Sequence, residues 1–399
     1  MSYYETALKL FKSSKYERAA KAFQKAVDKK SDTYKSLAGL GESMAKIGDL
    51  KKQEEVSVIA SKMASTQARY DFLCKNYADF YSDIEEYTRA IEYYEKAIQY
   101  NRNYFTAYNN MAMVYYNLKE YEKAIEYCIM ALRLNPRDDV SYNALGIIYS
   151  EIGEYEKAVE CYRKMILLNP KDEYPYNGLG NIYNKLGDYE NAIQYYKKAI
   201  EINSKFEYPY NGLGSIYYKH LKDYAKAIEY YKKAIKVKPT YEYPFLNLGN
   251  IYRLKQDYKN AINYYKKYLA LDNNSEECYF NLASIFFYQK EYQSALEHYK
   301  KALKINPKNE EIYVNLGKIY QTIGKKEKSI QIFKRAIKIS PDNPYLYNDL
   351  AEVYNETKNQ KEAINCYKKA INIFKAKEDE KENEVIVKPA GPVAASMDR

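Results

Sequence analysis

The chain has 399 residues, with 63 Lys and Arg against 53 Asp and Glu, so its formal net charge is +10. No stretch approaches 18 consecutive apolar residues, so no membrane span is expected. The five cysteines lie far apart with no CxxC pair, which argues against a disulfide framework and predicts reduced, buried thiols. The first residues lack the apolar core of a signal peptide, and together these features predict a cytoplasmic protein.

The N-terminal segment 1–70 carries two loose copies of a pattern that becomes regular further along. In residues 1–33, small and apolar side chains recur at helical spacing on two successive segments. In residues 34–70 the second segment loses the pattern, because Gln53 and Ser57 stand where a small residue and an aromatic are expected. We therefore predict a degenerate N-terminal block at 1–70 and a regular array at 71–377.

The array is most regular where the same stretch of sequence, called here the repeated phrase, occurs three times in succession. It begins at Glu173, returns at Glu207, and returns again at Glu242. The second interval exceeds the first by only a single inserted position. A nearly fixed period of this length is the signature of a repeat architecture.

Each copy of the phrase predicts two antiparallel helices joined by a short turn. Tyr176, Leu179 and Tyr183 fall on one helical face, and Tyr196 belongs to a second such face. Gly187 lies between the two faces, where a helix C-cap favours a residue that accepts positive φ. Neither helix can bury its apolar face alone, so successive repeats must stack.

After residue 377 the composition changes. The segment 378–399 is highly charged at first and then rich in small residues, with two prolines and few apolar side chains. We expect the last helix to run on for a turn or two, and the tail to be disordered because it has little apolar surface to offset the entropy of ordering.

The repeated phrase resembles the tetratricopeptide repeat. That family combines an aromatic, Leu-Gly, Tyr, Ala, a second aromatic and a second Ala within one repeat. The matching positions here are Tyr176, Leu179, Gly180, Tyr183, Ala192, Tyr196 and Ala199, while Ser204 stands where the family often has Pro. The resemblance covers residues 1–377 and implies an all-α, right-handed superhelical solenoid of about eleven antiparallel helix-turn-helix repeats. In this family the first helices line a concave face that commonly binds a peptide.

The sequence contains no arrangement typical of catalysis. Its two histidines, His220 and His298, are far apart in the sequence, so we expect neither a histidine-centred catalytic triad nor a histidine metal site. The pair Gly178 and Gly180 lies inside a predicted helix and lacks the third glycine of a dinucleotide loop. We therefore expect a non-enzymatic protein with no cofactor, no metal and no small-molecule substrate.

Asparagines recur at the first-helix positions that would face the groove. Asparagine is roughly 0.6 kcal/mol worse than alanine inside a helix, so its repetition favours a use, although codon bias would also produce it. An asparagine amide can donate to and accept from a peptide backbone. The candidate peptide-binding residues are Asn109, Asn143, Tyr174, Asn177, Asn181, Tyr208, Asn211, Tyr243, Asn247, Asn250, Asn281 and Asn315.

The favoured function is a protein-interaction scaffold whose Asn/Tyr groove binds protein or peptide segments, with Asn177, Asn181, Asn211 and Asn250 free of intramolecular partners. One alternative is binding of nucleic acid or an anionic surface through outer lysines such as Lys197 and Lys198, although a solvated face is the simpler explanation. Another is a regulatory arm for a separate enzyme. The chaperone-tail clamp of some family members requires a lysine where the regular repeats have asparagine, so that partner is not expected.

Overall fold

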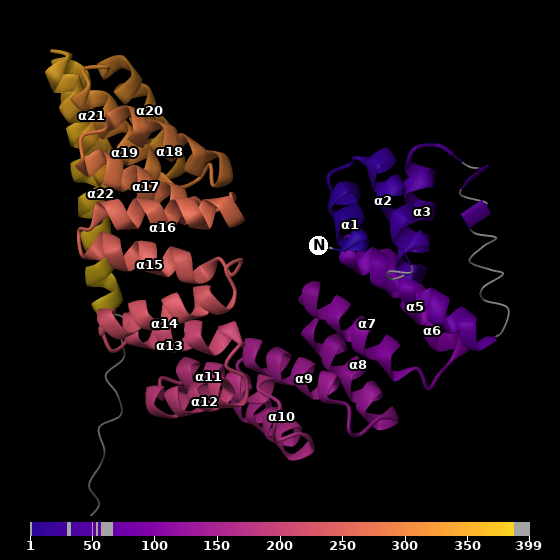
Figure 1. Cartoon of the computed structure of the whole chain (residues 1–399). Coiled ribbons are helices and arrows are strands. Elements are labelled where there is room, and N and C mark those ends of the chain that lie inside the picture. Colours follow the sequence, from indigo (N-terminus) through magenta and orange to yellow (C-terminus); the bar gives the residue numbers. More distant parts are fainter. Residues whose placement is uncertain (1, 30–32, 50, 53–54, 57–66, 387–399) are drawn as a thin grey trace, which may run out of the picture. The chain divides into compact units, whose positions relative to one another are not determined.

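The structure is a computed structural model that describes residues 2–29, 33–49, 51–52, 55–56 and 67–386. All regular secondary structure in these residues is helical, and 21 helices follow one another along the described chain (Figure 1). The expected all-α class is therefore confirmed. The two departures predicted at Gln53 and Ser57 lie outside the described residues.

The helices are α1 (Tyr3–Lys12), α2 (Tyr16–Asp28), α3 (Thr33–Lys46), α5 (Gln67–Asp83), α6 (Tyr87–Tyr100), α7 (Phe105–Asn117), α8 (Tyr121–Leu134), α9 (Asp139–Glu151), α10 (Tyr155–Leu168), α11 (Tyr174–Lys185), α12 (Tyr189–Ile202), α13 (Glu207–Lys219), α14 (Tyr224–Val237), α15 (Tyr243–Leu254), α16 (Tyr258–Leu271), α17 (Glu276–Tyr288), α18 (Tyr292–Ile305), α19 (Glu310–Thr322), α20 (Lys326–Ile339), α21 (Pro344–Glu356) and α22 (Gln360–Ile386).

The chain forms two compact units, an N-terminal unit (Met1–Ile216) and a C-terminal unit (Tyr217–Arg399), each considered by itself. Within each unit, neighbouring helices pack as pairs such as α9 with α10 and α17 with α18. The first helices of successive pairs also touch, as α9 does with α7 and α11. This is the stacking that one-sided apolar helices require.

A buried aromatic ring lies at the centre of most regular pairs, although α8 has Cys128 at this position. In α12, Tyr196 is 1% exposed, and its ring lies between the backbones of Gly180 and Gly212. A Cβ atom on Gly180 would lie 2.6 Å from the ring, and one on Gly212 would lie 2.5 Å from it. The glycines are therefore needed for the close approach of ring and helix.

Other tyrosines stack in parallel within a pair. Tyr183 and Tyr195 lie 5.3 Å apart with an interplanar angle of 6°, and Tyr252 and Tyr264 repeat this geometry at 5.4 Å and 5°. Offset ring stacking adds to the energy of area burial. The many tyrosines are thus the ordinary packing aromatics of this chain.

The turn between paired helices uses the left-handed backbone conformation. Gly187 has φ +79°, which confirms the C-cap predicted there. At the equivalent turn of the C-terminal unit, however, Gln256 adopts φ +58° despite its side chain. The turn geometry is therefore retained even where the sequence does not supply glycine.

The cysteines and the last helix bear on two further predictions. All five cysteines are buried, and burial raises the pKa of the Cys128 thiol to about 12. No described helix is both long and apolar enough to cross a membrane. Helix α22 continues to Ile386, and the rest of the tail, 387–399, lies outside the described residues.

Candidate peptide-binding site

Most of the central tyrosines in the second helices use their hydroxyl to bond the first helix of the same pair. The partner stands at the same sequence separation before the tyrosine in each case. The bonds are Tyr94 Oη to Asp79 Oδ1 at 2.7 Å, Tyr196 Oη to Asn181 Oδ1 at 2.7 Å, Tyr265 Oη to Asn250 Oδ1 at 2.6 Å, and Tyr299 Oη with Ser284 Oγ at 3.1 Å.

The prediction that Asn181 and Asn250 have free side chains is therefore wrong. Both accept a hydrogen bond from the hydroxyl of a buried tyrosine. Asn250 is bound further, because Asn281 donates to its oxygen at 3.0 Å and its own amide donates to Glu277 at 3.1 Å. These asparagines hold helices together, although the Asn181 side chain remains exposed.

Asn109 also has a structural role that the sequence did not indicate. It is 4% exposed, its amide donates to Asp138 Oδ2 at 2.7 Å, and its oxygen accepts from the hydroxyl of Ser141. Asp138 caps α9 by accepting from the backbone N–H of Ser141. Asn109 thus links α7 to the start of α9, and its buried side chain is not accessible to a ligand.

The remaining asparagines that were predicted to line the groove make no such hydrogen bond to a neighbouring helix. The side-chain oxygens of Asn177 and Asn211 are shielded from solvent and have no hydrogen-bond partner among the described residues, as predicted. Asn143, Asn247 and Asn315 are half-buried, and the described chain supplies no hydrogen bond to their side chains.

The three predicted groove tyrosines lie at the starts of first helices. Tyr174, Tyr208 and Tyr243 are 53%, 42% and 52% exposed, and each precedes a proline in the first turn, where proline fits a helix. The rings of Tyr174 and Tyr208 pack against buried Phe206, with centroids 4.8 and 5.3 Å away. One face of each aromatic is thus supported, while much of its surface meets solvent.

Tyr162 departs from the tyrosine pattern in the N-terminal unit. Ile147 occupies the first-helix position that supplies the acceptor to Tyr94, Tyr196 and Tyr265 in their pairs, so no acceptor is present there. The Tyr162 side chain is 4% exposed, and its hydroxyl makes no hydrogen bond within the described residues. Burial raises the pKa of Tyr162, so the hydroxyl stays protonated at neutral pH. Gly178 lets the hydroxyl end of the ring approach α11 closely, since a Cβ there would be 2.4 Å from Tyr162 Cζ.

A pocket of about 250 Å³ opens beside this tyrosine, and we call it the α9–α11 pocket. Its lining residues are Ile147, Ser150, Glu151, Tyr162, Gly178, Asn181, Asn184 and Lys185.

Two features of the α9–α11 pocket define its chemistry. Lys185 Nζ lies 3.0 Å from Glu151 Oε1 and 3.3 Å from both oxygens of Ser150, which joins α11 to α9. The side-chain oxygen of Asn184 is shielded from solvent and has no partner in the described chain. The pocket therefore combines a hydroxyl and an amide that have unused hydrogen-bonding capacity.

Tyr162 and Asn184 were not among the candidate residues predicted from the sequence. Asn184 lies two helical turns after Asn177 on the same helical face, so helical spacing could have indicated it. Tyr162 carries a weaker signal, which is the apolar Ile147 in place of the polar residue that most other repeats have there.

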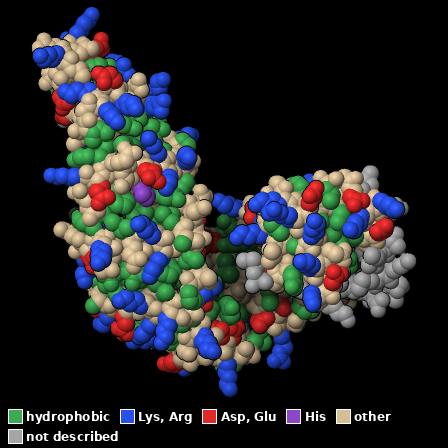
Figure 2. All heavy atoms as spheres, turned by 45° about the horizontal axis from the view of Figure 1, so that its top comes forward, with side chains coloured by type: hydrophobic (Ala, Val, Ile, Leu, Met, Phe, Trp, Pro, Cys, Tyr) green, Lys and Arg blue, Asp and Glu red, His purple; other side chains and the backbone are tan. Residues whose placement is uncertain are grey.

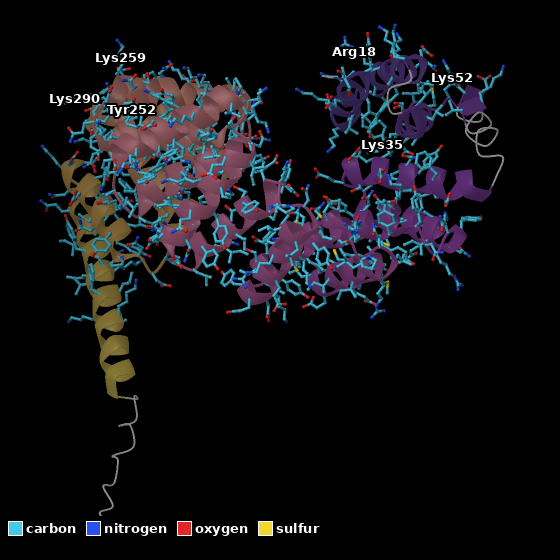
Figure 3. All side chains as sticks on the ribbon, turned by 60° about the horizontal axis from the view of Figure 1, so that its bottom comes forward. Arg18, Lys35, Lys52, Tyr252, Lys259 and Lys290 are labelled. Carbon is cyan, nitrogen blue, oxygen red and sulfur yellow. The ribbon has the colours of Figure 1, made fainter. Side chains whose placement is uncertain are left out.

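The outer lysines have partners of their own. Lys198 Nζ lies 3.0 Å from Glu201, Lys233 Nζ lies 2.6 Å from Glu229, and Lys267 lies over the ring of Tyr264. Figure 2 shows basic and acidic side chains interspersed on the visible face rather than gathered by sign. In the C-terminal unit, Lys259 and Lys290 point outward into solvent (Figure 3).

The described residues offer no metal site, since no group of three or more His, Cys, Asp and Glu side chains is arranged to hold an ion. His298 bonds the carbonyl of Ser294 at 2.8 Å and packs beside Phe286, which is a structural role.

Comparison with family models decides the identity of the fold. Tetratricopeptide repeat models match 4–56, 74–104, 103–166, 174–206, 208–274 and 310–376, and a TPR repeat model matches 148–187 and 283–324. The chain belongs to the tetratricopeptide repeat family. Together the matches cover most of this TPR protein, including its loose N-terminal part. No curated protein matches the sequence.

Solved structures of other TPR proteins are similar to parts or most of the chain. MamA is 29% identical over 42% of this chain and 97% of its own, with a TM-score of 0.40. YrrB, described as a TPR protein with an unusual peptide-binding site, is 21% identical over 45% and 91%, with a TM-score of 0.41. A human IFIT1 mutant with Gppp-AAAA is 16% identical over 93% and 90%, with a TM-score of 0.50. These likenesses concern the fold.

Proposed function

We propose that this TPR protein is a non-enzymatic scaffold that binds an extended protein segment along its first helices. The α9–α11 pocket, we infer, takes an amide group of that segment. The observation that carries the proposal is the Tyr162 hydroxyl, which lacks the first-helix partner that Tyr94 and Tyr196 have.

The chemistry of the pocket favours an amide ligand. A buried polar group without a partner costs about 1–3 kcal/mol, so a ligand that satisfies it gains affinity. A peptide unit carries a carbonyl, which can accept from Tyr162, and an N–H, which can donate to the oxygen of Asn184. The volume of 250 Å³ is several times the ~30 Å³ share of one water and leaves room for an amide with its flanking carbons.

Neighbouring side chains on α11 extend the same surface. Tyr174 offers an exposed aromatic at the start of the helix, and Asn177 lies between it and the pocket with an unpartnered oxygen. Tyrosine gives contact area at low entropic cost, and amides fix the direction of a peptide backbone. We propose Asn143 and Asn211, at the same position of the adjoining repeats, as continuations of this row.

The lysine-rich outer face is a weaker candidate, because several of its charges are already paired with glutamates or lie over tyrosines. We accordingly propose no nucleic-acid partner. The buried cysteines support a cytoplasmic location. A role as the docking arm of a separate enzyme would use the same peptide surface.

The test is to select peptides from a random displayed library on the immobilised full chain and measure their Kd by calorimetry. Asn177→Ala and Asn184→Ala should each weaken binding by about 0.5–1.5 kcal/mol, roughly two- to tenfold in Kd, with little change in Tm. The control Lys197→Ala/Lys198→Ala should leave Kd unchanged.

The opposite pattern would sink the proposal. Binding that survives both asparagine changes but disappears with the lysine change would place the ligand on the outer face. A steep loss of affinity with added salt would point in the same direction.

A further inference from the structure

The hydroxyl of a central tyrosine belongs to a small hydrogen-bonded group in two other helix pairs. In the pair α5 and α6, Asp79 accepts from the Tyr94 hydroxyl, and Asn110 of the next first helix donates to the same carboxylate oxygen at 2.7 Å. The pair α15 and α16 repeats this arrangement, with an asparagine in both the accepting and the donating position. Each group therefore combines a hydroxyl, an acceptor and the side-chain amide of the following repeat.

Tyr162 lacks both of these partners. Ile147 stands at the acceptor position, and Gly178 stands where the next first helix supplies the donating amide in the other two pairs. Both positions line the α9–α11 pocket of about 250 Å³. The Tyr162 side chain, which is 4% exposed, also lines the pocket, and its hydroxyl end lies against α11 at Gly178. The pocket thus opens where other pairs hold polar side chains of their own.

The polar groups around the pocket favour a neutral ligand group. Lys185 and Glu151, the two charged side chains of the lining, are paired with each other at 3.0 Å, so neither is left to compensate a charged group that loses its hydration on entry. An apolar group would leave the Tyr162 hydroxyl and the Asn184 oxygen without partners, which is costly. A neutral group that both accepts and donates therefore fits best.

The primary amide of a glutamine or asparagine side chain matches these needs more closely than a backbone amide does. It offers a carbonyl and two N–H groups, whereas a peptide unit offers a carbonyl and one N–H. Its carbonyl and one of its N–H groups point to the same side, whereas those of a trans peptide unit point in opposite directions. The Tyr162 hydroxyl meets α11 at Gly178, and Asn184 belongs to the same helix, so a ligand with both functions on one side suits them.

We propose that the α9–α11 pocket selects peptides by a glutamine or asparagine side chain, whose amide takes the place of the one that Asn110 and Asn281 supply in other pairs. This inference rests on the proposed peptide-binding function and names the side chain that the pocket recognises. Peptides that bind this chain should therefore share one amide residue, while their other positions vary.

The test pans a phage-displayed library of random peptides in parallel on the full-length wild type and on Ile147→Asn. Peptides selected on the wild type should share a glutamine or asparagine at one aligned position. In Ile147→Asn the new amide stands at the same separation before Tyr162 as Asn181 does before Tyr196, so it should accept from the Tyr162 hydroxyl. The shared residue should then disappear from the selected peptides.

Met113→Asn is the matched control for this substitution. Met113 is half-buried at the equivalent position of α7, but Cys128 of α8 replaces the tyrosine, so the new asparagine meets no hydroxyl there. Peptides selected on Met113→Asn should keep the shared amide residue.

Calorimetry on one selected peptide measures the size of the effect. Replacing its amide residue by glutamate or methionine removes the N–H groups at similar size and should weaken binding roughly 5- to 150-fold, the factor for two lost hydrogen bonds. The same replacement should cost less in Tyr162→Phe, because one of the two partners is already gone. Tyr162→Phe removes a single oxygen, so it serves as the test variant if Ile147→Asn disturbs the fold.

Two results would overturn the proposal in different ways. If the peptides share no amide residue, or tolerate glutamate and methionine, while Tyr162→Phe still weakens binding, a backbone amide fills the pocket and the peptide-binding function is retained. If neither Tyr162→Phe nor Ile147→Asn alters binding, the pocket is not used and both proposals are wrong.

Discussion

Replacing Gly180 by alanine probes how closely the helices of this array approach one another. The new Cβ would lie 2.6 Å from Cδ1 and Cε1 of Tyr196, well inside the roughly 3.5–4.0 Å of ordinary carbon contact. The ring cannot retreat, because its far edge lies against Gly212 and its hydroxyl is bonded to Asn181 at 2.7 Å. The side chain or α11 must therefore shift.

Two opposing effects set the size of the change. Alanine is favoured over glycine inside a helix by about 1 kcal/mol. Overpacking a tight core costs about 1–3 kcal/mol, and a ring held on two sides belongs in the upper part of that range. We therefore expect Gly180→Ala to lower the free energy of unfolding by about 1–2 kcal/mol. Gly41→Ala is the control, since its Cβ would meet Val56 at an ordinary 3.7 Å and should be neutral or stabilising.

The assay is urea unfolding followed by circular dichroism, with a double-mutant cycle between Gly180→Ala and Tyr196→Leu. The smaller side chain leaves room for the new methyl, so the cycle should show a coupling of about 1 kcal/mol or more. A stabilising Gly180→Ala, or a cycle without coupling, would refute the packing argument.

Further predictions concern the turns, the buried weak acids and the thiols. Gln256→Gly should stabilise the chain by about 1 kcal/mol, because Gln256 has φ +58°, while Gly187→Ala should destabilise it by a similar amount; both are read from urea midpoints. Burial raises the pKa of Cys128 from 9.0 to about 12 and that of Tyr127 from 10.0 to about 12. The neutral forms are thus favoured in the folded state, so their contribution is complete below about pH 9 and is lost as pH rises toward 12, which circular dichroism against pH will follow. Native thiols should also react with a disulfide reagent at about pH 8 far more slowly than thiols of the urea-unfolded chain, and equal rates would contradict their burial.

The fold could be predicted because the same residue pattern recurs from repeat to repeat. Any single position of the phrase is ambiguous, but Glu173, Glu207 and Glu242 open three copies that fix the register. The structure then follows from two features that are visible in the sequence. Small residues face the buried rings, and a helix-ending residue follows each second helix. The turn at Gln256 shows that tertiary packing can enforce a backbone conformation that its own residue disfavours.

The site was only partly predictable, because one residue type serves two purposes. Asn181 and Asn250 stand at the same separation before a buried tyrosine, and this spacing could have revealed their structural role. Asn177 has no such tyrosine partner and keeps an unsatisfied oxygen. The α9–α11 pocket depends on a missing partner for Tyr162, which Ile147 signals only weakly in the sequence, and on the space left between two helices, which is not visible before the chain is folded.

The most direct test of the peptide-binding proposal compares Tyr162→Phe with Tyr196→Phe, using one library-selected peptide and calorimetry. Each change removes one hydroxyl from an equivalent ring, but only the Tyr196 hydroxyl makes a hydrogen bond within the fold. Tyr162→Phe should weaken binding by roughly two- to tenfold and leave Tm unchanged or slightly raised. Tyr196→Phe should lower Tm and leave Kd unchanged. If Tyr162→Phe binds as well as the wild type, the α9–α11 pocket is not the site.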